Sequence, residues 1–527
     1  MPRLAQSILE VLERHGVDTV FGIPGNHNIE LYRYLPASKI HHVTAHHEQG
    51  VGFMADGYAR ASGKPGICFL ISGPGVTNAL TAMAQALADS VPMLVIATVG
   101  DQSRREGRLH ELPDQLAVAS GVCVEAVQSD TPASALAWID QALEAHRHAR
   151  PGPRFIQIPL SWWQLEADVP APAEQAERVL DTVELERAGD LLEEAQRPLL
   201  LIGGGARDAG AEVAAFANLL GAPVVNTVNA KGVLAADHPL SVTSSPSMPA
   251  VRQLLSAADV IVAVGTELGE TDYDLLMSGP INWHAPILRI DIDADQAQMN
   301  VASTAALIGD AAEVLAALLT LLPDMRREVW ADLAVVRRDI AQHEHMHPQF
   351  AGLFATIDRV CPHAVVVGDS TRPTYYAAWM WERPASRKYW HSASGYGTLG
   401  YALSAAIGAQ LSVNAPVIAI IGDGGLLFTL GELAVAVREQ LPVKILLWDN
   451  CGFQEIAHSM AAQGIDTATT QYLSPNFAAI GAGFGAEVSA PKNLDELATA
   501  LAQPVPGPHL IHMREHLFIT QPSGEWY

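Results

Sequence analysis

The sequence is poor in cysteine and in basic residues. Its four cysteines, Cys68, Cys123, Cys361 and Cys451, are scattered along 527 residues without a CxxC spacing. This pattern excludes a disulfide framework or a cysteine-based zinc site and is typical of a reducing compartment. Lysine and arginine number 32 against 57 aspartates and glutamates, so the formal charge is −25. A surface this acidic argues against nucleic acid and anionic membranes as partners.

Long apolar runs are also lacking. No apolar stretch approaches the ~20 residues that span a bilayer. Residues 1–17 have the pattern of an amphipathic helix, without the apolar core or cleavage site of a signal peptide. We therefore expect a cytoplasmic protein with no membrane partner. The 49% of apolar residues can build several large cores, and the length suggests three or four domains at ~150 residues each.

Strand-like and helix-like segments alternate through most of the chain, which predicts an α/β fold of doubly wound parallel sheets. We expect three such domains, at 1–165, 186–325 and 348–527. Residues 166–185 are rich in Pro, Ala and Glu and have the composition of a linker. The glycines at 203–205 are weak evidence for a dinucleotide site, because no acidic residue follows where a GxGxxG fingerprint needs one. A structural role is the better interpretation of these glycines.

The stretch at 420–453 is the most informative part of the sequence. An apolar run at 416–421 predicts a buried parallel strand that ends on Gly-Asp-Gly. Residues 426–440 have the pattern of a helix, and 443–448 that of a second buried strand. Together these segments predict one βαβ unit.

This unit places Asp423 and Asn450 at the same edge of a parallel sheet, where such folds bind ligands. The glycines beside the acid, Gly424 and Gly425, allow the backbone to approach a phosphate. An Asp carboxylate, an Asn amide oxygen and a backbone carbonyl suit octahedral Mg²⁺. The alternative is a plain Gly-Asp-Gly turn and an Asn that caps the next helix. The spacing between the two residues favours the cofactor site.

This pattern resembles the cofactor signature of thiamine-diphosphate enzymes, in which GDG is followed by Asn-Asn. Here Asp449 stands in the place of the first Asn. Further segments are similar to the same superfamily: FGIPGN at 21–26, HHEQGVGFMADGYAR at 46–60, FLISGPGVTNAL at 69–80, RPGPRFIQIP at 150–159 and GYGTLGYALSAAIGAQL at 395–411. The resemblance covers nearly the whole chain and is closest to decarboxylases of 5-guanidino-2-oxopentanoate. Benzoylformate decarboxylase and acetohydroxyacid synthase resemble it less.

The resemblance implies three roles near the reactive end of thiamine diphosphate. Glu48 corresponds to the activating glutamate that hydrogen-bonds the pyrimidine ring, so that the cofactor's own exocyclic nitrogen can generate the ylid. Leu399 corresponds to the apolar side chain that holds the cofactor in a V shape. The carbonyl of Gly397 is expected to accept a hydrogen bond from the exocyclic nitrogen. Alone, Glu48 could be an ordinary N-terminal helix charge, and Leu399 ordinary core.

The resemblance also implies the metal and diphosphate contacts. Asp423, Asn450 and the carbonyl of Gly452 correspond to the protein ligands of Mg²⁺. Further diphosphate contacts are expected from segments 370–372 and 391–394.

Candidate substrate residues follow several of the predicted strands. Asn26 and His27 lie after the first glycine turn, and His110 lies where some family decarboxylases have a histidine and the synthases have glutamine. His110 could assist protonation of the product carbon after CO₂ departs, although a lone histidine is more often a surface or core residue. Gln454 and Glu455 follow the loop at 450–453, which we name the metal loop after its expected ligands. Both residues are expected to line the pocket.

Two further features of the sequence bear on the choice of substrate. Ile71 aligns with a histidine of benzoylformate decarboxylase, which argues against a copy of that mechanism. A guanidinium substrate would need carboxylates at the far end of the pocket. The candidates are Glu455, Glu111, Asp114 and Asp272, each of which could also be an ordinary surface charge.

These observations predict a Mg²⁺- and thiamine-diphosphate-dependent decarboxylase that converts a 2-oxo acid into an aldehyde. The substrate could be 5-guanidino-2-oxopentanoate or an aromatic acid such as benzoylformate. The alternatives are an acetolactate-synthase-like carboligase and a cofactor-binding paralogue without activity. The family resemblance further implies a homodimer or homotetramer with sites at the dimer interface. The C-terminal tail, 521–527, could be a lid over the site or a packed terminus.

Overall fold

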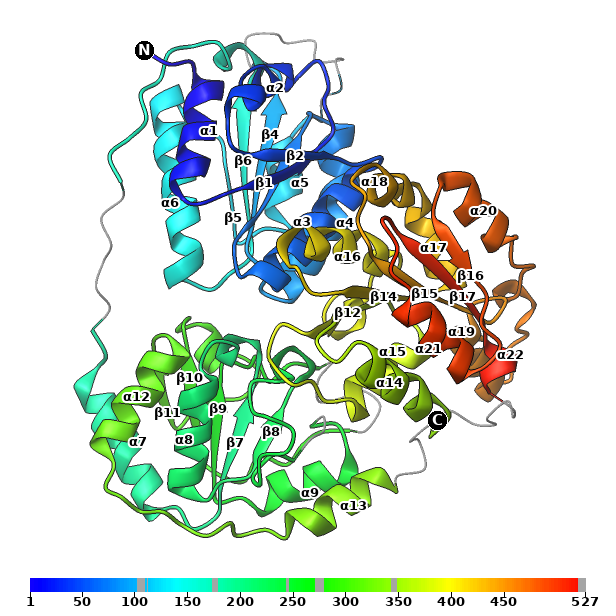
Figure 1. The fold of residues 1–527 in the computed structure, drawn as a ribbon. Coiled ribbons are helices and arrows are strands. Elements are labelled where there is room, and N and C mark those ends of the chain that lie inside the picture. The colour runs from blue at the N-terminus through cyan, green and yellow to red at the C-terminus, as the bar shows by residue number, and fades with distance from the viewer. Residues whose placement is uncertain are drawn as a thin grey trace. The chain divides into compact units, whose positions relative to one another are not determined.

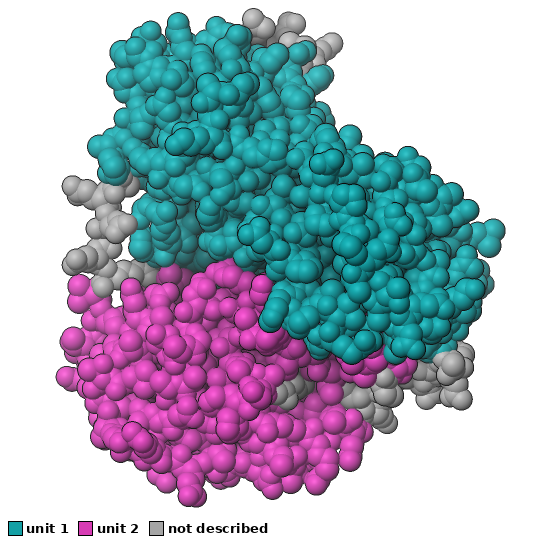
Figure 2. All heavy atoms as spheres, in the orientation of Figure 1, with its two compact units in different colours: residues 1–175, 356–371, 391–527 teal, residues 176–355, 372–390 magenta. Residues whose placement is uncertain are grey.

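The chain folds into three parallel β-sheets flanked by helices (Figure 1). The structure is a computed structural model that describes residues 1–101, 110, 112–172, 179–242, 246–270, 279–342 and 348–519. Its three parallel sheets confirm the predicted α/β fold class. Within these residues, no helix is long and apolar enough to cross a membrane. The chain forms two compact units, of which one contains 1–175, 356–371 and 391–527, and the other 176–355 and 372–390 (Figure 2).

The first sheet has six strands in the order β2-β1-β3-β4-β6-β5. Its strands are β1 Thr19–Gly22, β2 His41–Thr44, β3 Gly66–Leu70, β4 Met93–Val99, β5 Glu125–Val127 and β6 Pro153–Pro159. The accompanying helices are α1 Leu4–Arg14, α2 Ile29–Tyr34, α3 Glu48–Ser62, α4 Pro74–Ala88, α5 Gln115–Ser120 and α6 Pro132–His148. Strands β3 and β4 are almost entirely buried, as the continuous apolar runs predict for a sheet covered on both faces.

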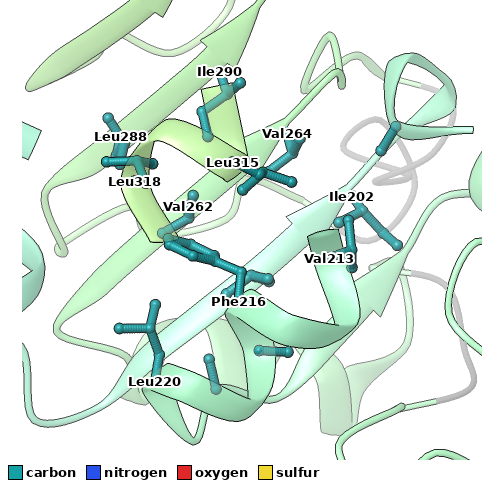
Figure 3. Packing of buried hydrophobic residues seen from close by; sticks show 14 of the residues in the cluster. Ile202, Val213, Phe216, Leu220, Val262, Val264, Leu288, Ile290, Leu315 and Leu318 are labelled. Atoms are coloured by element: carbon teal, nitrogen blue, oxygen red, sulfur yellow. The ribbon is translucent and has the colours of Figure 1, made fainter. Parts of the chain in front are cut away.

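The second sheet has five strands in the order β11-β10-β9-β7-β8. Its strands are β7 Pro198–Ile202, β8 Val224–Asn226, β9 Val260–Val264, β10 Ile287–Asp291 and β11 Ala305–Ile308. The accompanying helices are α7 Thr182–Glu194, α8 Gly210–Leu220, α9 Pro249–Ala257, α12 Ala311–Leu321 and α13 Leu333–Ala341. Phe216 of α8 belongs to the same buried cluster as Val262 and Leu318 (Figure 3).

The glycines at 203–205 are closely packed against the turn that follows β9. A Cβ atom on Gly203 would lie 2.3 Å from the carbonyl oxygen of Gly265, and one on Gly205 would lie 2.7 Å from the Cα of Gly265. A larger residue at either position would therefore collide with the neighbouring backbone. This close packing supports the structural role expected for them.

The third sheet has six strands in the order β13-β12-β14-β15-β17-β16. Its strands are β12 Val365–Gly368, β13 Tyr389–His391, β14 Val417–Gly422, β15 Lys444–Asp449, β16 Glu487–Ser489 and β17 His509–Arg514. Its helices are α14 Pro348–Val360, α15 Arg372–Met380, α16 Tyr401–Ser412, α17 Asp423–Thr429, α18 Leu433–Arg438, α19 Gln454–Ala462, α20 Phe477–Phe484, α21 Leu494–Ala502 and α22 Glu515–Phe518.

The single helix expected at 426–440 is wrong in detail. The structure has two short α-helices, α17 and α18, joined by the 3₁₀ turn η7, Leu430–Glu432. Two interactions accompany the break. The hydroxyl of Thr429 donates to the carbonyl of Gly400 at 2.7 Å. The carboxylate of Glu432 accepts from the backbone N–H groups of His46 and His47, which lie between β2 and α3. Gly431, a weak helix former, lies between Thr429 and Glu432.

The buried aromatic ring of Phe216 offers a test of the second sheet's core. Phe216 is 0% exposed, and its replacement by alanine leaves a cavity that surrounding side chains fill only in part. We expect Phe216→Ala to lower the free energy of unfolding by about 3–5 kcal/mol. Urea unfolding measures the change. Val183→Ala, at a side chain that is 69% exposed, serves as control and should change stability by less than about 0.5 kcal/mol. Equal effects of both substitutions would contradict this packing.

Candidate active site

The two strands β14 and β15 end at the same edge of the third sheet. Gly422 at the end of β14 pairs with Trp448 of β15. Asp423 begins α17 directly after β14, and Asn450 follows β15 directly. The structure therefore places Asp423 and Asn450 side by side at the carboxyl end of the sheet.

Three oxygen-bearing groups converge at this edge. One end of the Asn450 amide lies 2.9 Å from the carbonyl oxygen of Gly452 and 3.3 Å from Oδ1 of Asp423. Oδ2 of Asp423 accepts a hydrogen bond from the N–H of Gly452 at 3.0 Å. In octahedral Mg²⁺, ligand oxygens at 2.0–2.1 Å from the ion are about 2.9 Å apart. The spacing of these groups therefore fits a magnesium ion if the oxygen of the Asn450 amide faces the loop.

The loop around Gly452 is closed by a second segment. Gly452 has φ +154°, and a Cβ atom there would lie 2.4 Å from the carbonyl oxygen of Thr470, so this position requires glycine. The hydroxyl of Ser474 donates to Oδ2 of Asp423 at 3.4 Å. Burial raises the pKa of Asp423, while the nearby hydroxyl of Tyr472 and the hydrogen bond from the N–H of Gly452 oppose this shift.

Asp449, where the family pattern predicts asparagine, is held by partners from two other segments. Its carboxylate accepts from His512 of β17 at 2.7 Å and from the hydroxyl of Ser474 at 2.6 Å. It also accepts from the N–H of Cys451 at 3.2 Å, which fixes the start of the loop. Burial by itself would raise the pKa of Asp449, but these hydrogen bonds hold the pKa at about 2.

The loop that carries Leu399 lies against α17. Gly397 and Gly400 have φ values of +74° and +77°, which favour glycine. A Cβ atom on Gly400 would lie 2.6 Å from the Cβ of Phe428. Leu399 is half-buried rather than part of the core. A partly exposed apolar side chain on a loop fixed by two glycines is consistent with a contact to a ligand.

Asp369 is a buried acid that the sequence analysis did not single out. It follows β12 and accepts from the N–H groups of Ser370 at 2.9 Å, Gly400 at 3.3 Å and Ala402 at 3.1 Å. Asp369 thus holds the end of the Leu399 loop and the start of α16. Burial raises its pKa to about 6. Its place directly after an apolar strand was the only sequence signal for this role.

Glu48 is the first residue of α3, and its Oε2 accepts from the amide of Asn78 at 2.9 Å. Ile71 packs next to it. A Cβ atom on Gly75 would lie 2.7 Å from Cγ1 of Ile71 and 3.7 Å from Oε1 of Glu48, and one on Gly25 would lie 2.8 Å from Cγ2 of Ile71. The structure therefore brings together Glu48, Ile71 and the turn that precedes Asn26.

Two of the predicted histidines lie side by side at this edge. The rings of His27 and His110 have centroids 5.4 Å apart, and Nδ1 of His27 is 2.6 Å from the hydroxyl oxygen of Ser72. The carbonyl of His27 accepts from the hydroxyl of Thr98 at 2.8 Å, which fixes its backbone. His110 has a φ of +56°, a backbone conformation that is uncommon for residues other than glycine. Asn26, in the same turn as His27, is exposed.

Glu432 is the second acid that the sequence analysis missed. Its buried carboxylate accepts from the N–H of His46 at 3.2 Å and from the N–H of His47 at 2.9 Å, directly before Glu48. A Cβ atom on Gly50 would lie 2.3 Å from Oε1 of Glu432, so the glycine makes room for this carboxylate. Burial raises the pKa of Glu432 to about 7, and the nearby charge of Glu48 contributes to the rise.

Within one chain, the segment 423–432 thus separates Asp423 from Glu48. Asp423 begins α17, whose seven residues span about 10 Å. Glu432, at the other end, lies beside the turn that carries Glu48.

A buried ion network joins α3 to the start of α16. Arg60 donates to Asp56 at 2.7 Å and to Asp89 at 2.6 Å. The hydroxyl of Tyr401 donates to Asp56, and Gln85 donates to Asp89 at 2.7 Å. The arginine of the GYAR segment therefore has a structural role, and its position four residues after Asp56 was the signal that could have shown it.

The candidate acids have different surroundings. Asp114 caps α5 by accepting from the N–H of Ala117 at 2.9 Å. Glu455 is half-buried in the first turn of α19, after the metal loop. Glu111 and Asp272, like the tail at 521–527, lie outside the described residues. Gln454 donates to the carbonyl of Asn450 at 3.1 Å, so it supports the metal loop from the side of α19.

Comparisons with known proteins identify the class of enzyme to which this site belongs. Residues 2–118 match the N-terminal TPP-binding domain of thiamine pyrophosphate enzymes, 185–318 match the central domain, and 369–513 match the C-terminal TPP-binding domain. The chain therefore belongs to the family of thiamine pyrophosphate (thiamine diphosphate) enzymes, and thiamine diphosphate is its cofactor.

Individual relatives cover almost the whole chain. A probable 2-ketoarginine decarboxylase from Pseudomonas aeruginosa is 40% identical over 511 residues, which cover 93% of this chain and 90% of the relative. The large subunit of acetolactate synthase isozyme 1 from Escherichia coli is 31% identical, with coverage of 99% and 96%. A thiamin-diphosphate-dependent enzyme from Mycobacterium smegmatis, described as putative, shares the fold at a TM-score of 0.80 and 23% identity, with coverage of 98% and 99%.

The buried carboxyl group of Glu432 generates a pH-dependent prediction. Its pKa is raised from 4.5 to about 7, so the folded state holds this proton more tightly than the unfolded state. The stability that Glu432 contributes is full below pH ~4.5 and is lost as the pH rises to ~7. Glu432→Gln cannot lose a proton. We therefore expect the difference in melting temperature, wild type minus variant, to fall between pH 5 and pH 8.

Calorimetric melting curves at several pH values measure this difference. Glu10→Gln, at an exposed site of the same unit, controls for the removal of one negative charge. A difference between wild type and Glu432→Gln that stays constant over this range would contradict a buried carboxyl group with a raised pKa.

Proposed function

We propose that the chain is a Mg²⁺-dependent decarboxylase that converts a 2-oxo acid into an aldehyde and CO₂ with thiamine diphosphate as cofactor. The observation that carries this proposal is the convergence of Asp423, Asn450 and the Gly452 carbonyl at one sheet edge. One carboxylate, one amide and one carbonyl are ligands that Mg²⁺ accepts beside phosphate oxygens and water. Among the described residues, no group of three His, Cys, Asp or Glu offers another metal site.

The residues present fit the cofactor at its diphosphate end. Asp423, Asn450 and Gly452 would hold the magnesium ion, and the backbone at Gly424 and Gly425 would face the diphosphate. Both glycines are closely packed: a Cβ atom on Gly424 would lie 2.7 Å from the ring of Phe453, and one on Gly425 would lie 3.3 Å from Asp369. The same tight packing fixes the backbone that a phosphate would approach.

The residues also fit the reactive end. When bound, thiamine diphosphate supplies a nucleophilic carbon and an acceptor for the electrons released with CO₂. Glu48 would hold a proton against the pyrimidine ring, with Asn78 fixing its carboxyl group. Leu399 would support the bend of the cofactor, and the carbonyl of Gly397 would accept from its amino group.

The paired rings of His27 and His110 are suited to proton delivery. Release of an aldehyde requires one proton at the carbon that has lost CO₂. Imidazole is the side chain that takes up and releases a proton near neutral pH. Ser72 lies against Nδ1 of His27 at 2.6 Å and would orient that ring. Asn26, in the same turn, would contact the substrate.

The proposed substrate is 5-guanidino-2-oxopentanoate, also called 2-ketoarginine. The support is the 40% identity to a probable 2-ketoarginine decarboxylase. A guanidinium group binds best to a carboxylate that accepts two parallel hydrogen bonds. Glu455, half-buried after the metal loop, is the proposed partner, with Gln454 and Ile71 lining the pocket.

We further propose a homodimer, or a homotetramer built from such dimers, with sites shared between subunits. Within one chain, the segment 423–432 begins at Asp423, and Glu48 lies beside its far end, next to Glu432. Large apolar side chains near the metal loop are also exposed: Phe428 by 58%, Ile456 by 55% and Leu473 by 97%. A second subunit would cover them. The proposed domains, 1–165, 186–325 and 348–527, each contain one of the three sheets.

A panel of 2-oxo acids tests the proposed function. The protein, supplied with thiamine diphosphate and Mg²⁺, should release CO₂ from 5-guanidino-2-oxopentanoate faster than from benzoylformate or a branched-chain 2-oxo acid, with one aldehyde formed per CO₂. A preference for an uncharged acid would reject the guanidinium substrate but keep decarboxylation. Absence of CO₂ release from every acid would reject the decarboxylase.

Carboligation is the second candidate, because an acetolactate synthase is 31% identical over 99% of the chain. In that reaction a second carbonyl compound takes the place of the proton. His110, in a position where synthases have glutamine, favours protonation. Product analysis separates the two reactions: coupled products in excess over free aldehyde would favour the carboligase.

Complementation between two inactive variants tests the shared site. Glu48→Gln and Asp423→Asn should each lose most of the turnover while keeping the fold. In a homodimer with shared sites, a mixture of both chains forms some dimers with one intact site. Remixing after mild dissociation should therefore restore about a quarter of the wild-type activity. The control is each variant remixed with itself. A mixture that stays inactive although mass spectrometry shows mixed dimers would place Glu48 and Asp423 of the same chain in one site.

A further inference from the structure

We propose that Glu515 is a positioning residue that turns the amide oxygen of Asn450 toward the metal site. Glu515 is the first residue of α22, directly after β17. The inference rests on the proposed magnesium site and adds a residue that no comparison assigns to it.

Strand pairing brings Glu515 next to the metal loop. In the register of β15 and β17, Trp448 pairs with Met513 and Asp449 pairs with Arg514. Asn450 and Glu515 follow directly after these two strands. The indole N–H of Trp448 donates to Oε2 of Glu515 at 2.7 Å, and this same oxygen lies 3.5 Å from Nδ2 of Asn450.

The Asn450 amide has two possible orientations, and they suit different states of the site. With the nitrogen toward the loop, the amide donates to the Gly452 carbonyl at 2.9 Å and to Asp423 at 3.3 Å. That orientation satisfies the loop without a metal ion. With the oxygen toward the loop, three oxygens face one another, an arrangement that is favourable only around a cation.

Glu515 favours the second orientation. An ionised carboxylate only accepts hydrogen bonds. The Asn450 amide is therefore more stable with its nitrogen toward Glu515 than with its oxygen toward Glu515. Because Trp448 holds Oε2 in place, this preference exists before the metal ion arrives. Glu515 thereby selects the metal-binding orientation of Asn450, in the way that groups behind a metal ligand commonly fix its geometry.

The test measures Mn²⁺ affinity, with Mn²⁺ as a probe for Mg²⁺, in the presence of thiamine diphosphate. Electron paramagnetic resonance of free Mn²⁺ gives the affinity without any measurement of activity. Glu515→Leu is similar in size but removes the acceptor oxygen that faces Asn450, so the amide oxygen of Asn450 is no longer disfavoured there. We expect this variant to bind Mn²⁺ about 10-fold or more weakly. An affinity equal to that of the wild type would overturn the proposal.

A second background separates orientation from mere structural support. Asn450→Asp has two equivalent oxygens, so no orientation remains to be selected, and Glu515 opposes its charge. In this background, Glu515→Leu should leave Mn²⁺ affinity unchanged or increase it. A loss of the same size in both backgrounds would show that Glu515 supports the fold and does not orient the amide.

Trp448→Phe provides an independent cycle. It removes the N–H group that holds Glu515 and should weaken Mn²⁺ binding in the wild-type background, but have little further effect with Glu515→Leu. Additive losses would overturn the proposal. Trp138 and Glu125 form the same kind of pair, at 2.9 Å, elsewhere in the chain, so Trp138→Phe and Glu125→Leu are matched controls that should keep wild-type affinity.

The wild type and Asp423→Asn distinguish the two levels of inference. Tight Mn²⁺ binding by the wild type and its loss in Asp423→Asn support the proposed metal site, whatever Glu515 does. If the wild type binds no Mn²⁺, or Asp423→Asn binds it equally well, the metal site itself is wrong and the role of Glu515 is overturned with it.

Discussion

The buried guanidinium group of Arg60 is the interaction on which the site-bearing unit most depends. It is paired with Asp56 on its own helix and with Asp89 at the end of α4, and Asp56 also accepts from Tyr401 at the start of α16. Removal of one partner from such a buried network leaves an uncompensated charge, which costs about 3–5 kcal/mol. The network fixes α3, which begins with Glu48, against α16, which begins directly after the Leu399 loop. The positions of two proposed cofactor contacts therefore depend on charges that never touch the cofactor.

Close helix packing adds a steric constraint to this electrostatic one. A Cβ atom on Gly57 of α3 would lie 1.9 Å from the carbonyl oxygen of Ala405 on α16, and one on Gly408 of α16 would lie 1.8 Å from the carbonyl oxygen of Met54 on α3. Each helix thus contributes a glycine at which the other helix's backbone passes. Side chains of ordinary size would separate the helices and pull apart the network of Arg60. The small-residue sequences of both helices have this physical reason, whether or not a ligand is present.

Features set by local pattern could be predicted from the sequence, and features set by distant partners could not. The apolar runs and the Gly-Asp-Gly turn were enough to place Asp423 and Asn450 at one sheet edge. The break between α17 and α18 was not predictable in this way, because Glu432 is held by N–H groups almost 400 residues away in the sequence. Asp369 was missed for a related reason. In a chain with 57 acidic residues, a carboxylate that holds a loop differs from a surface charge only by its burial and its partners.

The unusual residues at the metal loop show how the site tolerates change. Asp449 stands where asparagine was expected, and His512 of β17 donates to its carboxylate. Trp448 precedes Asp449 on the same strand, and Glu515, just beyond β17, accepts from its indole. Both side chains are thus paired with residues on or just beyond the neighbouring strand, and these pairs support the backbone of the loop at the proposed metal site. The residues proposed for substrate binding lie elsewhere: Glu455 is on α19, and the two paired histidines are at the edge of the first sheet.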